Sequence, residues 1–420
     1  MKKISFAALM VAVVLSSCSN DSIPSVDQEV DSNALVPVSL GLNMSQADVE
    51  VATRGTGTVG GTTEAENVWN FENLYVLMTT SDKRALEDAD AEWGFTSVKG
   101  QILKEQFDNS FFARPKEVTR NESKVWTLDY QCDPNEGGNL KYYPTQGASD
   151  FFAYYVDDAA TEVDVMGNPV IESAANAISV AFTMDGSQDL LAGKADASAT
   201  ASFNGKNDNG DDILGFSAKS ARANLIPNIK MKHQLSRLTF TLKNGNAMTA
   251  GVFVDSLSVI SKYQGKMYVA YKDEPVSVMD WDDTEKELYL KQKRESTDEG
   301  YFENSLSEGK CPLKKFETIE MDGATDVAVG EALFICPGET SYTLKLYVRY
   351  SIDGGEEEEK EIPIEFTHPD KVSAFEAGKS YHLNVTIYGL ESITVDTQIE
   401  MWDQVDEDID VDSDGVQTYN

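Results

Sequence analysis

Residues 342–350 read Tyr-Thr-Leu-Lys-Leu-Tyr-Val-Arg-Tyr, and large apolar side chains recur at every second position. Successive side chains of a β-strand point to opposite faces of its sheet. This period of two therefore predicts a strand with one face in a core and the other in water. The turn sequence Asp353-Gly354-Gly355 follows closely. The stretch predicts a chain that folds as β-strands joined by turns.

The same alternation recurs on both sides of this stretch. Residues 238–242 precede the turn signal Asn244-Gly245, and residues 381–387 and 393–401 carry two more alternating runs. Leu74–Met78 is apolar throughout, which is typical of a buried strand. We therefore predict an all-β protein of two tandem β-sandwich domains, of the transthyretin-like or Greek-key type.

The start of the chain has the pattern of a bacterial lipoprotein signal. Lys2 and Lys3 precede an apolar run that ends at Leu15, and small residues then lead to Cys18. The run is too short to span a bilayer as a helix of the mature protein. We predict that residues 1–17 are a signal peptide and that a lipid on Cys18 holds the chain at the outer membrane. The alternative is an ordinary secretion signal with an incidental cysteine.

The composition fits an exported protein with a well-solvated surface. The chain has 420 residues, of which 71 are acidic and 35 basic, with a formal net charge of −36. A charge of that sign repels nucleic acid and anionic headgroups, so we expect no nucleic-acid partner. Aromatic residues make up 10 % of the chain, which favours strands over disorder.

Three cysteines remain once Cys18 is assigned to a lipid. In an oxidising compartment Cys311 and Cys336, the nearer pair in sequence, can form a disulfide that leaves Cys132 over. Equally, all three can be buried as small apolar side chains. The sequence leaves both alternatives open.

A short segment before the first domain has the pattern of one further strand. Residues 19–34 are polar and predict a tether. Four apolar residues then recur at every second position: Val36, Val38, Leu40 and Leu42. A Gly- and Thr-rich connector follows, and its one basic residue is Arg54.

These segments give a division of the chain into four parts. Residues 1–17 are the signal peptide, and residues 18–54 are the tether with the strand segment. Residues 55–225 and 226–420 are the two predicted sandwich domains, and the second ends in an acidic tail. The boundary lies near residue 225 because the surrounding segments are polar and loop-like.

The sequence contains no recognisable catalytic or cofactor-binding motif. Gly55, Gly57 and Gly60 form G-x-G-x-x-G, but the pattern lies in the connector and no helix follows to hold a pyrophosphate. Three histidines stand alone, without Cys, His or Glu at metal-ligand spacing: His233, His368 and His382. We expect no catalytic residue, no metal ligand and no cofactor, and we interpret His233 and His382 as polar residues on strand faces.

The acidic tail carries one incomplete metal motif. Asp410, Asp412, Asp414 and Gly415 match the opening of a calcium-binding loop, but the glutamate expected at its twelfth position is missing. The alternatives are weak extracellular calcium binding and a solvated acidic tail.

Four segments resemble the fimbrillins, the pilin subunits of type V pili. They are Leu15–Cys18, the pair Tyr142–Pro144 and Phe151–Tyr155, then His233–Phe240, and Ala377–Thr386 ahead of Trp402. Together they span almost the whole chain. Each is a loose pattern, and the order and spacing of the four carry the resemblance.

The resemblance implies two β-sandwich domains on a lipoprotein that is processed at the cell surface. In the family a trypsin-like protease cuts after an arginine in the loop behind the first strand, and Arg54-Gly55 has the matching place. The cut would release the strand segment and open a groove. A strand from the next subunit would fill that groove, so that an extracellular, adhesive fimbrium grows by donor-strand exchange.

The donor predicted for this exchange is the last alternating run from Ile393 to Met401, with an extension as far as Val416 left open; its apolar residues are Ile393, Val395, Ile399 and Met401. A strand can add to an open sheet edge through main-chain hydrogen bonds while alternate side chains fill apolar pockets. Four buried side chains contribute roughly 6–12 kcal/mol before ordering costs, at ~1.5–3 kcal/mol each. Repeated head to tail, the contact gives a filament and not a closed ring.

The expected partners follow from this hypothesis. They are other pilus subunits, the processing protease, the outer membrane and a receptor on a host or bacterial surface. If the acidic tail cannot donate a strand, the chain would be a tip or accessory subunit. The alternative class is a lipid-anchored module that binds glycan or host protein without polymerising.

Overall fold

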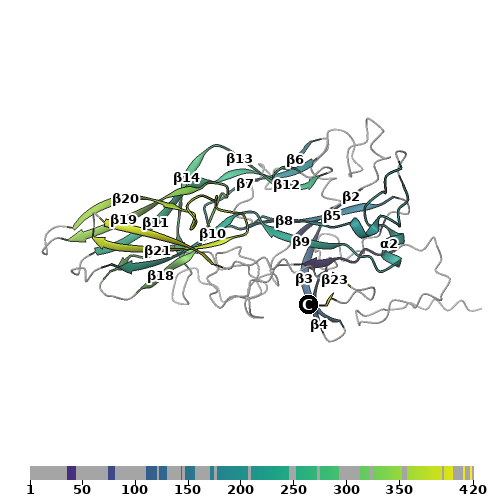
Figure 1. Cartoon of the computed structure of the whole chain (residues 1–420), viewed down its shortest axis with the longest axis horizontal. Helices are drawn as coiled ribbons and strands as arrows, with labels where there is room; N and C mark the ends of the chain where they lie inside the picture. The colour runs from purple at the N-terminus through teal and green to yellow at the C-terminus, as the bar shows by residue number, and fades with distance from the viewer. Residues whose placement is uncertain are drawn as a thin grey trace, which may run out of the picture. The chain divides into compact units, whose positions relative to one another are not determined.

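The computed structural model of the protein describes residues 36–43, 74–80, 110–120, 123–129, 143, 147–156, 171–174, 177–206, 210–245, 252–271, 275–292, 313–321, 326–351, 357–389, 392–400, 410–411 and 417–418. Nearly every element in this part of the chain is a β-strand (Figure 1). Two short helices interrupt them, the 3₁₀ turn η6 (Ser198–Thr200) and α2 (Ala218–Arg222). Among the described helices, none is long and apolar enough to cross a membrane. The predicted all-β class is confirmed.

Seven strands close a barrel in the order β1-β4-β3-β2-β5-β8-β9. They are β1 (Gly41–Asn43), β2 (Leu74–Thr80), β3 (Ser110–Arg120), β4 (Ser123–Asp129), β5 (Ser149–Val156), β8 (Leu190–Ala195) and β9 (Asn228–His233). Neighbouring strands are antiparallel, except that β1 runs parallel to β9. β1 pairs with β4 on one side and β9 on the other, so the barrel would be open at this point without it.

Two sheets from the later part of the chain form a sandwich. One has the order β18-β10-β21-β22, and the other has the order β14-β11-β19-β20, with β17 paired to β11. Figure 1 shows them as two layers. Their strands are β10 (Ser236–Asn244), β11 (Val252–Lys262), β14 (Glu285–Tyr289), β17 (Ile319–Glu320), β18 (Val327–Ile335), β19 (Ser341–Ser351), β20 (Glu357–Thr367), β21 (Ser380–Gly389) and β22 (Ser392–Glu400).

A further sheet and two short ladders complete the described strands. The sheet β13-β12-β7-β6 consists of β6 (Ile171–Ala174), β7 (Ala177–Thr183), β12 (Gln264–Tyr271) and β13 (Met279–Trp281). The ladders join β15 (Lys291–Gln292) with β16 (Lys314–Lys315), and β23 (Asp410–Val411) with β24 (Gln417–Thr418). Both the β12–β7 pairing and the place of β9 in the barrel link residues on the two sides of position 225. The division into two domains near residue 225 stays a prediction.

The buried apolar residues form two clusters. The barrel core consists of Val38, Leu40, Val76, Tyr143, Phe151, Ala153, Tyr155, Leu191, Ala195, Ala197, Phe216, Ile229 and Met231. The sandwich core fills the space between the two later sheets and continues onto β5, β7 and β12; it includes Leu257, Leu333, Leu344, Leu346 and Tyr381.

The apolar residues that alternate in the sequence are also the ones that are buried in the structure. In β19, Tyr342, Leu344, Leu346 and Val348 are buried in the sandwich core, and the residues between them are half-buried. β5 is buried on both faces, because Phe151 belongs to the barrel core and Phe152 to the sandwich core. A strand between two cores has no polar face, which explains the unbroken aromatic run in the sequence.

Candidate functional site: the groove that holds β1

Residues 36–43 form an extended segment that is buried at every second position. Val38 and Leu40 are 2 % and 3 % exposed, whereas Pro37 and Ser39 lie on the exposed side. Val36 is half-buried and packs against the barrel core. This alternation is the geometry of a strand that fills a groove with one face.

The groove itself is the barrel core without Val38 and Leu40. At its centre Phe151 is fully buried and meets the rings of Tyr143 and Phe216 edge to face, with centroids 6.0 Å from each. Burying Val38 and Leu40 there contributes about 3–6 kcal/mol, at ~1.5–3 kcal/mol per side chain. The segment is therefore an integral part of this core.

The described residues pair with the segment through two strands and two further main-chain hydrogen bonds. Three residues of β1 pair with β9, from Gly41 beside Asn228 to Asn43 beside Lys230, and Gly41 pairs with Thr127 of β4. Two hydrogen bonds outside the strands add to these. The Gly41 N–H donates to the Pro227 carbonyl at 2.8 Å, and the Tyr143 N–H donates to the Val36 carbonyl at 3.0 Å. The burial of Val38 and Leu40 adds to this pairing in holding the segment in place.

Two glycines permit the close approach of strands around the groove. A Cβ atom on Gly41 would lie 3.0 Å from Oδ1 of Asn228, so a side chain there requires the asparagine to move. A Cβ atom on Gly193 of β8 would lie 2.4 Å from the Lys230 carbonyl oxygen and 2.9 Å from Sδ of Met231. Gly193 therefore lets β9 pack closely on β8 and lets Met231 reach the barrel core.

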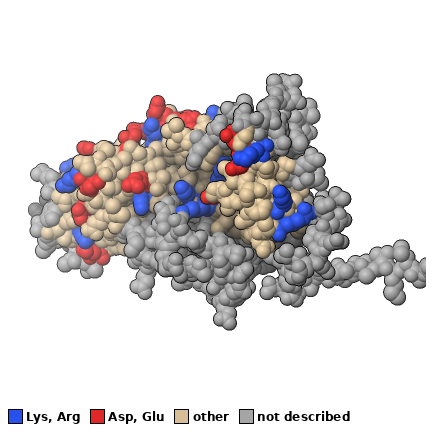
Figure 2. Space-filling view, turned by 45° about the vertical axis from the view of Figure 1, so that its right-hand side comes forward, with Lys and Arg blue, Asp and Glu red and all other residues tan. Residues whose placement is uncertain are grey.

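The outer face of β9, beside β1, is basic. Ile229 and Met231 are buried in the barrel core, whereas Lys230 and Lys232, which alternate with them, are exposed. Lys194 of β8 is directly opposite Lys230 in the β8–β9 ladder. Figure 2 shows Lys and Arg side chains on both sides of this view, and most of the Asp and Glu side chains on its left. A groove flanked by lysines is unusual in a chain of net charge −36.

The described residues include only some of the predicted site. Val36, Val38 and Leu40 lie in or at the groove, and Leu42 lies in β1, although its side chain is not among the described ones. Four predicted positions fall outside the described residues, namely Cys18, Arg54, Gly55 and Met401. Lipidation and cleavage at these positions stay predictions.

The predicted donor strand is paired within its own sheet. β22 forms an antiparallel ladder with β21 over nine residue pairs, from Glu400 with Ser380 to Ser392 with Gly389. Ile393 and Val395 are half-buried against the sandwich core, whereas Ile399 is 57 % exposed. The structure therefore brings the two predicted strands to different places, β1 into the barrel core and β22 to a sheet edge.

Sequence reasoning missed the basic flank of the groove. The signal was present, because residues 228–233 read Asn-Ile-Lys-Met-Lys-His and alternate apolar with basic side chains. The polar residues just before them predicted a domain boundary instead. The histidines lie as expected, since His233 ends β9 and His382 lies in β21. His233 Nδ1 is 2.8 Å from Oδ2 of the buried Asp189, and His382 Nδ1 is 2.8 Å from Oγ1 of Thr239.

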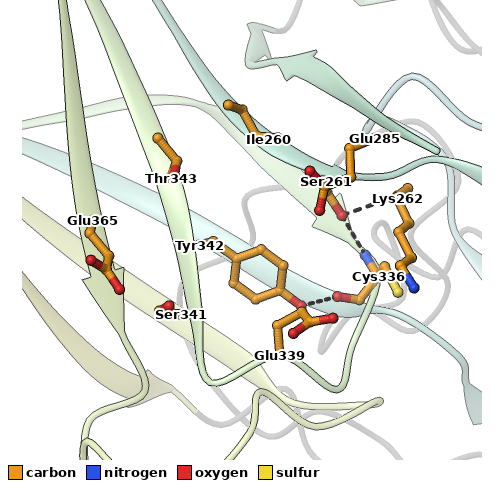
Figure 3. Close-up of a pocket in the computed structure, with 10 residues that line it drawn as sticks. All are labelled: Ile260, Ser261, Lys262, Glu285, Cys336, Glu339, Ser341, Tyr342, Thr343 and Glu365. Atoms are coloured by element: carbon orange, nitrogen blue, oxygen red, sulfur yellow. Dashed lines mark hydrogen bonds between the residues drawn. The ribbon is translucent and has the colours of Figure 1, made fainter. Parts of the chain in front are cut away.

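A second candidate site is a cavity of about 180 Å³ at one end of the sandwich (Figure 3). Its polar lining includes Lys262, Glu339 and Glu365, and the Tyr342 ring points between the strands toward Cys336. The Tyr342 hydroxyl donates to the Cys336 carbonyl, and the Cys336 N–H donates to Oγ of Ser261 at 3.1 Å. These bonds tie β11, β18 and β19 together at this end.

The polar residues around this cavity have a structural role. Cys336 is a buried free thiol, and burial raises its pKa to about 12, so it is neither a nucleophile nor a ready metal ligand near neutral pH. Its candidate disulfide partner Cys311 lies outside the described residues. Within the described ranges no three His, Cys, Asp or Glu side chains are grouped to hold a metal ion. Of the calcium motif, only Asp410 is described, in β23.

The comparison with protein families identifies the chain. The fimbrillin-like family matches residues 63–402, which is most of its length. The chain belongs to the fimbrillin-like family. The resemblance found in the sequence is thereby confirmed. No curated protein matches this fimbrillin-like chain.

Several solved structures are similar to this fimbrillin-like chain. A candidate cell adhesion protein from Bacteroides ovatus shares 15 % identity at a TM-score of 0.41, covering 89 % of this chain and 100 % of the other. One from Bacteroides uniformis shares 15 % identity at 0.40, covering 88 % and 98 %. The fimbrial anchor protein Mfa2 from Porphyromonas gingivalis shares 11 % identity at 0.31, covering 87 % and 98 %. Membership rests on the family match.

Proposed function

We propose that this protein is a non-enzymatic structural subunit of a cell-surface fimbrium that serves adhesion. It is exported as a lipoprotein on Cys18 and kept from assembling by residues 36–43, which occupy its own groove. Cleavage after Arg54 frees that segment, and a strand of another subunit takes its place. The observation that supports this most strongly is the burial of Val38 and Leu40 in the barrel core.

Cleavage changes the free-energy balance that keeps the buried segment in its groove. While the connector is intact, the segment rebinds intramolecularly at a high effective concentration. After the cut it is a separate peptide, and its ~3–6 kcal/mol of side-chain burial must offset the cost of association, estimated at 4–15 kcal/mol. The released peptide therefore leaves the groove. A longer strand on a folded partner then fills it with more buried side chains and a longer ladder.

One observation favours a second function, that of a tip or accessory subunit. The predicted donor β22 is fully paired with β21, so donating it would break a nine-pair ladder. A subunit that accepts a strand without donating one would end a filament. Such a subunit would bind a donor strand after cleavage but would not form ladders by itself.

The proposal is tested on the purified full-length precursor with an arginine-specific protease. We expect a cut after Arg54, loss of the peptide that contains residues 36–43, and ladders that withstand mild heating in detergent. Mass spectrometry of the released peptide and of the ladder bands gives the cut site.

The matched control is Arg54→Ala. This variant should keep residues 36–43 and stay monomeric under the same treatment. Release of the peptide without ladders, but with binding of an added donor strand, would support the tip subunit. Retention of the peptide after a complete cut at Arg54 would refute both functions.

A further inference from the structure

We propose that the outward face of the sheet β14-β11-β19-β20 is a binding site for a neutral glycan, whose sugar rings lie on the side chains of Tyr289 and Tyr347. The inference goes beyond the proposed function, because it concerns a surface outside the groove and names the class of ligand that an adhesive subunit would hold. The surface belongs to the sandwich, so it should be present in the uncut precursor.

Both tyrosines stand on the solvent side of this sheet. In β14, Tyr289 follows Leu288, which is fully buried in the sandwich core, and in β19 Tyr347 follows the equally buried Leu346. Successive side chains of a strand point to opposite faces, so the two rings face away from the core. The Tyr289 side chain is 45 % exposed, and Tyr347 is half-buried. Two aromatic side chains are therefore open to a partner.

The two rings lie side by side across the strand that separates them. β11 runs between β14 and β19, and it places Ser258 opposite Tyr289 and Ser256 opposite Tyr347. Serine side chains are short, so the rings can approach each other over them. Their centroids are 6.1 Å apart, and the angle between their planes is 31°. The tyrosines thus form one tilted aromatic surface.

A shared carboxylate holds the two rings in place. The hydroxyls of Tyr289 and Tyr347 both donate to Oε2 of Glu287, at 2.6 and 2.7 Å. Lys345 donates to the other oxygen of Glu287, and its Nζ atom is also 2.8 Å from Oε1 of Glu361. Side chains that are ordered before binding lose little further entropy when a ligand arrives. The surface is therefore preorganised.

The chemistry of this surface suits a sugar. The negative face of an aromatic ring attracts C–H groups, which line the faces of a pyranose ring. Beside the rings, the exposed Glu361 and the partly exposed Lys345 supply an acceptor and a donor for hydroxyl groups. A wholly apolar partner would take these ionic groups out of water without replacing their hydrogen bonds.

The charge of the protein makes a neutral glycan the better ligand. The chain has a net charge of −36, and the cluster of Glu287, Lys345 and Glu361 holds two acidic groups and one basic group. A sulfated or uronic-acid polymer would be repelled by this field, whereas an uncharged sugar would not.

The test measures glycan binding by the uncut full-length precursor. An array of neutral glucans, mannans, galactans and N-acetylhexosamine oligosaccharides is probed together with heparin, and the strongest neutral oligosaccharide is then used for isothermal titration. We expect binding to a neutral glycan and none to heparin. Tyr289→Ala and Tyr347→Ala should each weaken binding about tenfold, the scale of one lost aromatic contact. Tyr289→Phe keeps the ring and should bind within about threefold of the wild type.

The matched control is Ile399→Ala, which shortens an exposed apolar side chain of the other sheet and should leave the affinity unchanged. Circular dichroism should show every variant folded at the assay temperature. Absence of binding to all neutral glycans, a preference for heparin, or wild-type affinity in Tyr289→Ala would overturn this inference and leave the proposed function standing. The Arg54→Ala precursor should bind the glycan as the wild type does, because failure to assemble concerns the groove alone.

Discussion

β1 and β22 lie near the two ends of the described chain, and they are held in different ways: β1 has a neighbour on both sides in the closed barrel, whereas β22 is the last strand of its sheet. β1 has a ladder of only three residues with β9 but stands in a segment whose Val38 and Leu40 are almost fully buried. β22 has nine residue pairs with β21, but its Ile399 is 57 % exposed. A strand held by its side chains can be exchanged for another with a similar apolar face. A strand held by its ladder cannot leave without breaking its hydrogen bonds.

The largest expected effect is at Leu40. Leu40→Ala should lower the free energy of unfolding of the uncut protein by about 2–5 kcal/mol, because it opens a cavity in the barrel core. Chemical denaturation followed by tyrosine and tryptophan fluorescence measures the change. A loss below ~0.5 kcal/mol, typical of a surface substitution, would contradict the role of this segment in the core.

Acid should lower the stability of the sandwich that contains β22, and it should leave the contribution of Leu40 in the groove unchanged. Burial alone would raise the pKa of Glu287, but hydrogen bonds from Lys345, Tyr289 and Tyr347 lower it to about 2. Because this folded-state pKa is below the unfolded value of about 4.3, the stabilisation is complete above that value and is lost as the pH falls toward 2.

The variant Glu287→Gln should therefore lose about 1 kcal/mol at pH 7, since the carboxylate is partly exposed and its ion pair is screened. The difference from the wild type should shrink between pH 4.5 and pH 2, as measured by melting temperature across that range. Leu40→Ala provides the contrast, because its defect should not change with pH. A Glu287→Gln defect that is constant with pH would argue against the ionic origin.

The fit between β1 and β9 should show as coupling between two positions. Gly41→Ala places a Cβ atom against Asn228, and Asn228→Ala removes the obstructing side chain. We expect a coupling energy of about 0.5–1 kcal/mol in a double-mutant cycle of the uncut protein. Strict additivity would mean that Asn228 turns aside freely and that the register of β1 is not fixed at Gly41.

The smallest effect is expected at the edge of the sandwich. Ile399→Ala deletes apolar atoms from β22, yet its side chain is more than half exposed. The free energy of unfolding should therefore change by no more than ~0.5 kcal/mol. A loss as large as that of Leu40→Ala would remove the contrast between the two strands.

Much of the fold was predictable because strand burial has a period of two. Residues 342–350 and Val36 to Leu40 follow that period in the sequence and in the structure. The basic flank of the groove was harder to predict, since Lys230 and Lys232 gain their meaning only from the neighbour of β9. Nothing in the sequence states that a segment near residue 40 lies beside residues near 230.

The sequence by itself determined the all-β class, the alternating faces and the membership signals of the fimbrillin-like family, because these depend on local periodicity and short motifs. Tertiary structure decided which strand closes the barrel, which strand pairs along its full length, and where the lysines stand. Those outcomes depend on contacts between residues far apart in the chain, such as Leu42 with Ile229 and Ile399 with Tyr381. Local patterns predict that a strand has an apolar face, whereas only the packed sheets select what covers it.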